Sequence, residues 1–209
     1  MGVKLLLNSV SGLCLRSTLA ALVSALTSLS NYFMSKIGRQ PIHIPEGVTI
    51  TMRNSKIQVS GPSGMLERIL PIQITVKKGE DELKIMSKNK ALWGTWRAHI
   101  ANMVRGVTQG FEKRVEIHGI GYKIGLQGDK LICQVGFSHP VSALIPYGLA
   151  CEVNENILTI RGIDKEKVGQ FAAFVRSIKP PDSYKGKGIR YVGEVVKLKP
   201  GKRVGVGAV

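Results

Sequence analysis

The chain has 209 residues, of which 44% are hydrophobic, so it can form one large domain or two small ones with an ordinary core. Its 30 lysines and arginines outnumber the 14 acidic residues, and the net charge of +16 predicts a polyanionic partner, either nucleic acid or an anionic membrane surface. Three cysteines without a C-x-x-C pair argue against a disulfide framework and a zinc site, and they fit a reducing compartment.

The positive charge is unevenly distributed along the chain. Residues 1–33 carry a net charge of +2, residues 34–115 carry +8, residues 116–178 are neutral, and residues 179–209 carry +6. A neutral body flanked by basic segments is typical of a protein that docks on RNA or DNA. A protein that is merely soluble needs no such segregation of charge.

Residues 1–33 form an N-terminal extension that is rich in Leu, Ser and Ala and contains no acidic residue. This composition is typical of an organelle transit peptide, and we interpret the extension as a targeting peptide. A helix here would place on one face Leu19, Leu22, Val23, Leu26 and Leu29. Polar residues interrupt the stretch too often for a membrane span of about 20 apolar residues. Two alternatives stay open, a secretory signal peptide and a start-site artefact in which Met34 is the true first residue.

The body contains an internal repeat at a constant offset of 75 residues. Identical residues recur at this offset in the pairs Gly61/Gly136, Ser63/Ser138, Pro71/Pro146, Glu80/Glu155, Leu83/Leu158, Ile85/Ile160, Lys90/Lys165, Gly94/Gly169 and Ala98/Ala173. Apolar residues keep the same phase between these pairs. The repeat predicts two copies of one supersecondary unit, residues 34–115 and residues 116–209, the second of which includes the basic C-terminal tail.

In the first unit, alternating apolar residues predict antiparallel strands near residues 48–52, 57–59, 65–70, 72–76 and 83–85. The period then changes to that of a helix, with Asn89 as the expected cap. The apolar stripe of this helix consists of Leu92, Trp93, Trp96, Ile100, Met103, Val104 and Val107. Because both tryptophans lie on the stripe, we expect them to pack in the core and not to stack on bases.

The second unit repeats this order, with strands near residues 115–117, 131–135, 141–145 and 158–160. Its helix should begin after Asp164 and end before Pro180 and Pro181, which cannot continue a helix. Cys133 and Cys151 lie among the strands and are expected to be buried as small hydrophobic residues. The predicted fold class is therefore α+β, with two tandem similar units that each consist of an antiparallel β-sheet and one main helix packed on one face. Units of about 75 residues are marginal alone, so contact between them is expected.

The most basic stretch of the chain is residues 179–203, which combine eight lysines and arginines with four glycines and three prolines. Such a stretch can neutralise phosphates and bring backbone amides close to them, although a basic tail can also be solvated and disordered. The spacing of Val192, Val195, Val196 and Leu198 indicates that part of the segment packs on the body.

No catalytic constellation is present, because the four histidines are scattered and the glycine-containing motifs do not match a P-loop or a dinucleotide fingerprint. We therefore predict no enzyme activity, no metal site and no cofactor. Residues 187–194 match the single-strand RNA-binding signature only in part, since its third and eighth aromatic positions are Ile189 and Glu194. Basic side chains and glycines without stacking aromatics favour structured RNA, which is bound through its backbone and shape.

The sequence also resembles a specific family. MSKIGRQPI at residues 34–42, IP-x-GV at 44–48, GP-x-G at 61–64, GFSHP at 136–140, GQFAA at 169–173 and PP-x-x-YKGKGIRY at 180–191 are similar to the large-subunit ribosomal protein six family, in its bacterial and organellar form. The similarity extends from about residue 34 to residue 203. The block at residues 180–191 is its most specific part.

This resemblance implies two similar α+β domains and a structural role in translation within the large ribosomal subunit. It implies binding to large-subunit rRNA in the 3′ domain, near the factor-binding site and the sarcin–ricin loop, beside neighbouring large-subunit proteins. It implies no small-molecule substrate and no membrane for the mature body. The implied rRNA-binding residues are Tyr184, Lys185, Gly186, Lys187, Gly188 and Arg190, with Lys197, Lys199, Lys202 and Arg203 assisting, and a second contact at Ser35, Lys36 and Gly38.

Two departures from the family pattern bear on location and contacts. The extension before Met34 favours an organellar ribosome, and we favour a plastid over a mitochondrion because the body stays close to the bacterial pattern. If Met34 is the true start, a bacterial-type cytoplasmic ribosome is expected instead. Residues 204–209 lack the usual lysine-rich finish. An alternative function is that of a free-standing RNA-binding regulator that uses the same basic segment.

Overall fold

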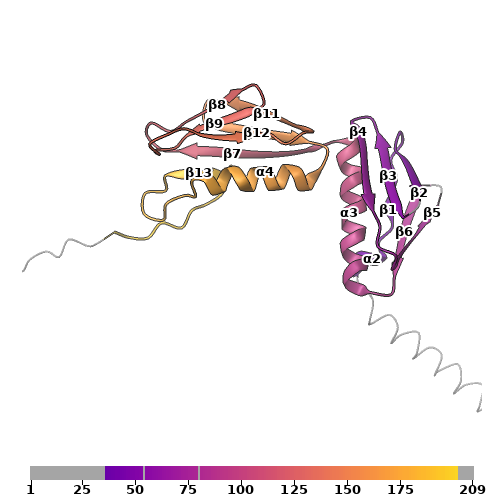
Figure 1. Ribbon diagram of the computed structural model, residues 1–209. Coiled ribbons are helices and arrows are strands. Elements are labelled where there is room, and N and C mark those ends of the chain that lie inside the picture. Colours follow the sequence, from indigo (N-terminus) through magenta and orange to yellow (C-terminus); the bar gives the residue numbers. More distant parts are fainter. Residues whose placement is uncertain (1–35, 54, 80, 202–209) are drawn as a thin grey trace, which may run out of the picture. The chain divides into compact units, whose positions relative to one another are not determined.

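The computed structural model describes residues 36–53, 55–79 and 81–201 (Figure 1). The predicted helical face of the targeting extension lies outside these residues. The chain forms two compact units, one that comprises the described residues up to His43 together with Pro71–Ala98, and one formed by Ile44–Leu70 and the chain from His99 onward. The border between these compact units falls between Ala98 and His99, inside a helix. The two predicted repeats are instead consecutive stretches of sequence, so their boundary near residue 115 stays a prediction.

The first compact unit contains a three-stranded antiparallel sheet in the order β1 (Ile42–His43), β6 (Glu82–Ser87), β5 (Ile74–Lys78). It also contains α2 (Lys36–Arg39) and the first half of α3 (Lys90–Thr108). Trp93 lies buried on α3, and its indole Nε1 donates a hydrogen bond to the carbonyl oxygen of Ile85, 2.6 Å away. The expected core position of this tryptophan is therefore confirmed.

The second compact unit begins with a sheet in the order β2 (Thr49–Arg53), β3 (Lys56–Gly61), β4 (Gly64–Ile69). The alternating side chains Ile57 and Val59 on β3 are fully buried, as the period of two predicts. The C-terminal half of α3 approaches this sheet where the backbone amide of Ser63 donates to the carbonyl oxygen of Val107, at 2.9 Å. Gly61 permits this approach, because a β-carbon there would lie against the Val107 side chain.

The same unit continues with two further antiparallel sheets. One has the order β10 (Val141–Leu144), β9 (Lys130–Gln134), β8 (Lys123–Gln127), and the other has the order β11 (Leu149–Asn154), β12 (Ile157–Gly162), β7 (Phe111–His118), β13 (Gly188–Tyr191). The helix α4 (Lys165–Ile178) packs along β7, β12 and β13 (Figure 1). Side chains from both sheets and from α4 share one core, which includes Leu131, Cys133, Leu158, Phe171 and Ile189.

The predicted α+β class with antiparallel strands is confirmed, and the 75-residue offset carries β2–β6 onto β8–β12 and α3 onto α4. The strands of each repeat divide between two sheets instead of forming one. The point at which the chain passes from one sheet to the other is equivalent in the two repeats. After β4 a turn forms in which Ile74 N donates to Pro71 O at 3.1 Å, and after β10 Leu149 N donates to Pro146 O at 3.3 Å. Proline has no N–H group to donate to a neighbouring strand, so the strand pairing ends at Pro71 and at Pro146.

The predicted helix boundaries are confirmed by their capping bonds. Asn89 Oδ1 accepts a hydrogen bond from Ala91 N at 3.1 Å, and Asp164 Oδ1 accepts one from Glu166 N at 2.9 Å. The second helix ends at Ile178, two residues before Pro180. No helix in residues 36–53, 55–79 and 81–201 is long and apolar enough to cross a membrane.

Cys133 is fully buried and Cys151 is half-buried, as expected for small hydrophobic residues. Burial raises the pKa of each thiol to about 11. Both side chains are therefore protonated at neutral pH, and neither is a reactive thiolate.

Candidate nucleic-acid interface

The basic segment leaves α4 at Lys179 and returns to the sheet at β13, so that residues 179–189 form a closed loop. Ile189 N donates to the carbonyl oxygen of Lys179 at 2.8 Å, and Asp182 N donates to that of Lys187 at 2.9 Å. Gly186 N donates to Asp182 O, also at 2.9 Å. These bonds fix the backbone around Lys185 and Lys187, so the two lysines extend from a defined turn.

Asp182 is one of two acidic residues in the segment, and its carboxylate braces the loop from within. Oδ1 accepts from Tyr184 N at 3.2 Å, and Oδ2 accepts from Lys185 N at 3.3 Å. Aspartate commonly closes a turn by accepting from backbone amides two or three residues ahead. The acid therefore orders the loop and does not simply reduce its positive charge.

Gly188 lets the loop close against the prolines that end the helix. Its φ is +145°, and a β-carbon built there would lie 2.7 Å from the carbonyl oxygen of Pro180 and 2.7 Å from the Cα of Pro181. Only glycine fits such an approach. The next residue, Ile189, is fully buried and pairs with Ile117 of β7. Packing at Gly188 and Ile189 therefore fixes the backbone at this point, and this backbone positions the neighbouring residues Lys187 and Arg190.

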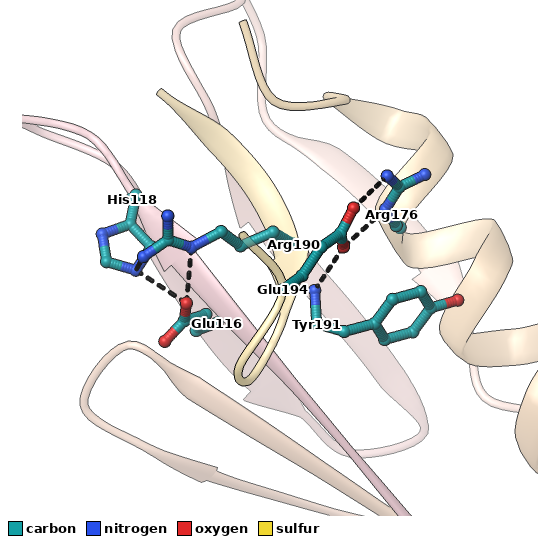
Figure 2. A network of polar contacts seen from close by, with 6 residues as sticks. All are labelled: Glu116, His118, Arg176, Arg190, Tyr191 and Glu194. Atoms are coloured by element: carbon teal, nitrogen blue, oxygen red, sulfur yellow. Dashed lines mark hydrogen bonds and ion pairs between the residues drawn. The ribbon is translucent and has the colours of Figure 1, made fainter. Parts of the chain in front are cut away.

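Arg190 follows on β13, where Glu116 of β7 holds it and His118 of the same strand lies beside it (Figure 2). Its Nε lies 2.5 Å from Glu116 Oε1, and its Nη2 lies 2.8 Å from His118 Nε2. Partial burial acts to raise the pKa of Glu116, but hydrogen bonds from Arg190 and His118 and the charge of Arg190 together hold this pKa below its ordinary value. Glu116 is thus ionised at neutral pH and fixes the guanidinium in place.

A second ion pair closes the turn that follows β13 (Figure 2). Glu194 accepts two hydrogen bonds from Arg176 of α4, with Nη2–Oε1 at 2.5 Å and Nε–Oε2 at 3.2 Å, and a third from Tyr191 N at 3.0 Å. The Arg176 bonds and the Tyr191 amide lower the pKa of the Glu194 carboxyl. The turn is therefore tied to the helix on the side opposite the Glu116 contact.

The loop and the end of β7 together line an open groove of about 450 Å³. Its lining residues are His118, Gly119, Ile120, Lys185, Gly186, Lys187, Arg190, Val196 and Leu198. Three of these residues carry a permanent positive charge and none carries a carboxylate. The arrangement can accept a phosphate, since lysine and arginine neutralise phosphate charge and release its counterions.

The predicted site residues are only partly brought together. Lys185, Gly186, Lys187 and Arg190 line the groove, and Tyr184 is 60% exposed beside them. Lys197 and Lys199 are exposed on the following stretch, whereas Gly188 is buried. In the other compact unit, Lys36 is exposed on α2 and Gly38 is buried against the Trp93 ring. Ser35, Lys202 and Arg203 lie outside the described part of the chain.

The expectation that part of the segment packs on the body is confirmed, but of the four residues whose spacing suggested it only Val196 is half-buried. The segment does pack on the body, but it does so through Ile189 on β13 and not mainly through the later apolar residues. Val192, Val195 and Leu198 are 47%, 89% and 58% exposed. The spacing of these residues does not reflect a strand or a helix, because residues 192–201 form no regular element.

Sequence reasoning missed the residues of β7 and of the turn after it, Glu116, His118 and Ile120. They lie about seventy positions before Arg190, and only the pairing of β13 with β7 brings them to the groove. The Gly119-x-Gly121 motif was a usable signal. It marks a close approach, since a β-carbon on Gly119 would lie 2.6 Å from the Tyr122 ring.

Comparisons with known proteins agree with these observations. The family model described as Ribosomal protein L6 matches residues 44–110 and 118–192. The chain is 49% identical to the large ribosomal subunit protein uL6 of Dictyoglomus turgidum over 176 residues, which cover 81% of this chain and 98% of that protein. It is 48% identical to the uL6 protein of Thermodesulfovibrio yellowstonii and 46% identical to that of Gloeothece citriformis, with the same coverage of this chain and 98% of each relative. The chain therefore belongs to the ribosomal protein L6 family.

Proposed function

We propose that this protein is a structural constituent of the large ribosomal subunit, where it binds large-subunit rRNA through the basic groove and supports translation. The observation that carries the proposal is the groove itself, in which Lys185 and Lys187 extend from a braced loop beside Arg190. The names of the relatives, each a large ribosomal subunit protein, support this assignment. A structural role also fits a chain in which the sequence contains no catalytic constellation.

We extend the proposal to the partners that the family implies. The rRNA site is the 3′ domain near the factor-binding site and the sarcin–ricin loop, and neighbouring large-subunit proteins complete the surroundings. The contacts on the protein are the residues named above from Tyr184 to Arg203, with a second contact at the Ser35–Lys36–Gly38 element. Two separate matches of one family model, at residues 44–110 and 118–192, support two tandem domains that meet near residue 115.

We also propose that the ribosome is organellar, with a plastid favoured over a mitochondrion, and that residues 1–33 are a targeting peptide. The acid-free composition of these residues supports the proposal. The relatives named above are bacterial proteins, and their identity to this chain is equally compatible with a bacterial-type cytoplasmic ribosome that begins at Met34.

The decisive experiment is sedimentation of the tagged full chain from a cell extract, followed by sequencing of the RNA in the peak. Migration with large subunits that carry organellar rRNA is the expected result and identifies function and compartment together. Large subunits with cytoplasmic rRNA would remove the organellar part of the proposal. A free protein with mixed short RNAs would overturn the ribosomal role and favour an RNA-binding regulator.

The groove is tested by charge removal. The Lys185→Ala/Lys187→Ala double variant should bind deproteinised large-subunit rRNA more weakly, and its log–log salt dependence should flatten by roughly 0.7–0.9 for each lost phosphate contact. Arg190→Ala added to this pair should flatten it further, because Arg190 lines the same groove.

The matched control for this charge removal is Lys77→Ala/Lys130→Ala, which loses the same charge from exposed strand positions outside the groove. It should bind with the wild-type slope. If both double variants behave alike, the groove has no special part in RNA binding.

A further inference from the structure

The groove has an apolar wall that a purely electrostatic phosphate site does not need. Ile120 is 90% exposed and Leu198 is 58% exposed, and both line the groove together with Val196. Exposed apolar side chains are common when they occur singly, but a cluster in a concave site marks a surface that is covered by a ligand.

Ile120 is presented by a tight turn that directly follows β7. Tyr122 N donates to Gly119 O at 3.3 Å, and Gly121 has a φ of +78°, the value that glycine adopts at the third position of a type II turn. Gly119 packs directly on the Tyr122 ring, which fixes the base of the turn. The turn therefore holds Ile120 at a defined position in the lining of the groove.

The lysine loop also lines the groove and adjoins this apolar wall. Gly186 has a φ of +68°, and a β-carbon at this residue would be 3.5 Å from Leu198 Cδ2, so the loop backbone lies against the apolar wall. Lys185 and Lys187 have no carboxylate partner in the described ranges. Arg190 is held by Glu116 and lies beside His118, and Glu116 does not itself line the groove.

Resting on the proposed function, we propose that the groove holds one whole nucleotide of the folded RNA. The phosphate lies at Lys185, Lys187 and Arg190, and the ribose with one face of its base lies against Ile120, Val196 and Leu198. His118 serves as a positioning residue, since its Nε2 contacts the guanidinium of Arg190 and its ring lines the groove. The volume of about 450 Å³ lies in the usual range of sites for small-molecule-sized groups, about 300–1,000 Å³.

The charge of the lining restricts the possible occupants to anionic groups. A phosphodiester strand brings one negative charge with an apolar sugar and base on the same unit, which matches cations on one side and aliphatic side chains on the other. An acidic peptide could also present a carboxylate beside an apolar side chain. The family membership of the chain favours RNA, and the peptide is an outcome of the test.

The test uses Ile120→Ser in the full chain, with Val195→Ser as the matched control. Val195 is 89% exposed, about as exposed as Ile120, and it lies in the same segment as Leu198 but outside the groove. Both substitutions act on exposed side chains, so the fold should survive, and circular dichroism with a thermal melt checks this. Binding to deproteinised large-subunit rRNA is measured over a range of salt concentrations.

We expect Ile120→Ser to weaken binding by about tenfold at every salt concentration, with an unchanged log–log slope, because it removes apolar contact and no phosphate contact. Val195→Ser should bind as the wild type does. An excess of an acidic peptide should not displace the RNA from the wild type.

Three results would overturn the nucleotide site. If Ile120→Ser binds normally while Lys185→Ala/Lys187→Ala is weakened, the groove is an electrostatic surface only and the proposed function stands. If neither variant changes binding, the proposed function fails as well. If the acidic peptide displaces the RNA and its own binding depends on Ile120, the groove is a protein-docking site.

Discussion

The basic segment has two halves that share a composition but differ in how they are attached. Residues 179–191 form a closed loop and a strand, and Ile189 within them is fully buried. Residues 192–201 form no regular element, and Val195 within them is 89% exposed. Basic residues and glycines occur in both halves. The second half is attached more lightly, for example by the backbone hydrogen bond from Lys199 N to Ser183 O at 2.8 Å. The difference shows that charge alone does not define a binding surface, because the first half fixes the backbone of its cations far more completely before any partner arrives.

The largest expected effect tests the buried anchor of the first half. Ile189→Ala should lower the free energy of unfolding by roughly 3 kcal/mol, because it leaves a cavity in a fully buried site between β13 and α4. Leu198→Ala in the second half should cost less than about 0.5 kcal/mol, since that side chain is 58% exposed. Urea unfolding of both variants measures the two values, and equal losses would contradict the comparison.

The next effect tests the backbone approach at Gly188. A β-carbon there meets backbone atoms of Pro180 and Pro181, so Gly188→Ala should destabilise the protein by about 2–4 kcal/mol and weaken RNA binding by opening the loop. Gly193 also has a positive φ, +82°, but no atom lies within 4 Å of its would-be β-carbon. Gly193→Ala should therefore cost only about 1 kcal/mol, and a similar cost at both positions would show that backbone strain, not the close approach, matters.

The smallest effect concerns the ion pair at the junction of the halves. The pKa of Glu194 is lowered in the folded protein by Arg176 and the Tyr191 amide, while its unfolded value is about 4.3. The stabilisation is therefore present above that pH and is lost as the pH falls through the folded-state pKa. Glu194→Gln should lower the melting temperature at pH 7, by an amount equivalent to about 1 kcal/mol.

The difference in melting temperature between wild type and Glu194→Gln should disappear as the pH falls below the folded-state pKa of Glu194, and scans from pH 7 to about pH 2 follow it. In an Arg176→Gln background the effect of Glu194→Gln should shrink, because the residue whose hydrogen bond is the largest cause of the lowered pKa is gone. A difference that persists at the lowest pH, where the carboxyl is protonated in the folded protein, would mean that Glu194 stabilises the turn by packing instead of by charge.

Local signals predicted much of the fold from the sequence. The helix limits followed from Asn89, Asp164 and Pro180, whose effects on the backbone are confined to a few residues. The repeat followed from residues at a fixed offset, and corresponding elements do begin at corresponding residues, as Lys90 and Lys165 show. These features depend on neighbours in the chain, so a single sequence contains what is needed to find them.

The candidate site was less predictable because its parts come from distant segments. The lysine loop was evident from charge and glycine content, but the contact of Arg190 with Glu116 depends on the pairing of β13 with β7. The sequence pattern does not indicate with which strand a short edge strand such as β13 will pair. The spacing that included Val195 correctly indicated a packed segment but did not identify the buried residue, because spacing has meaning only within a regular element.

The position of β13 also affects the solubility of the protein. Strand β7 is eight residues long, and β13 pairs with its C-terminal half, Val115–His118, which would otherwise be part of an open sheet edge. A long open edge offers unpaired amides and carbonyls to any other strand and promotes aggregation, whereas β13 is short and followed by a turn that stops further pairing. Removal of residues 179–201 would thus expose a self-associating edge as well as remove the basic groove. The segment that we propose binds RNA therefore also covers half of a sheet edge through which copies of this chain could otherwise pair.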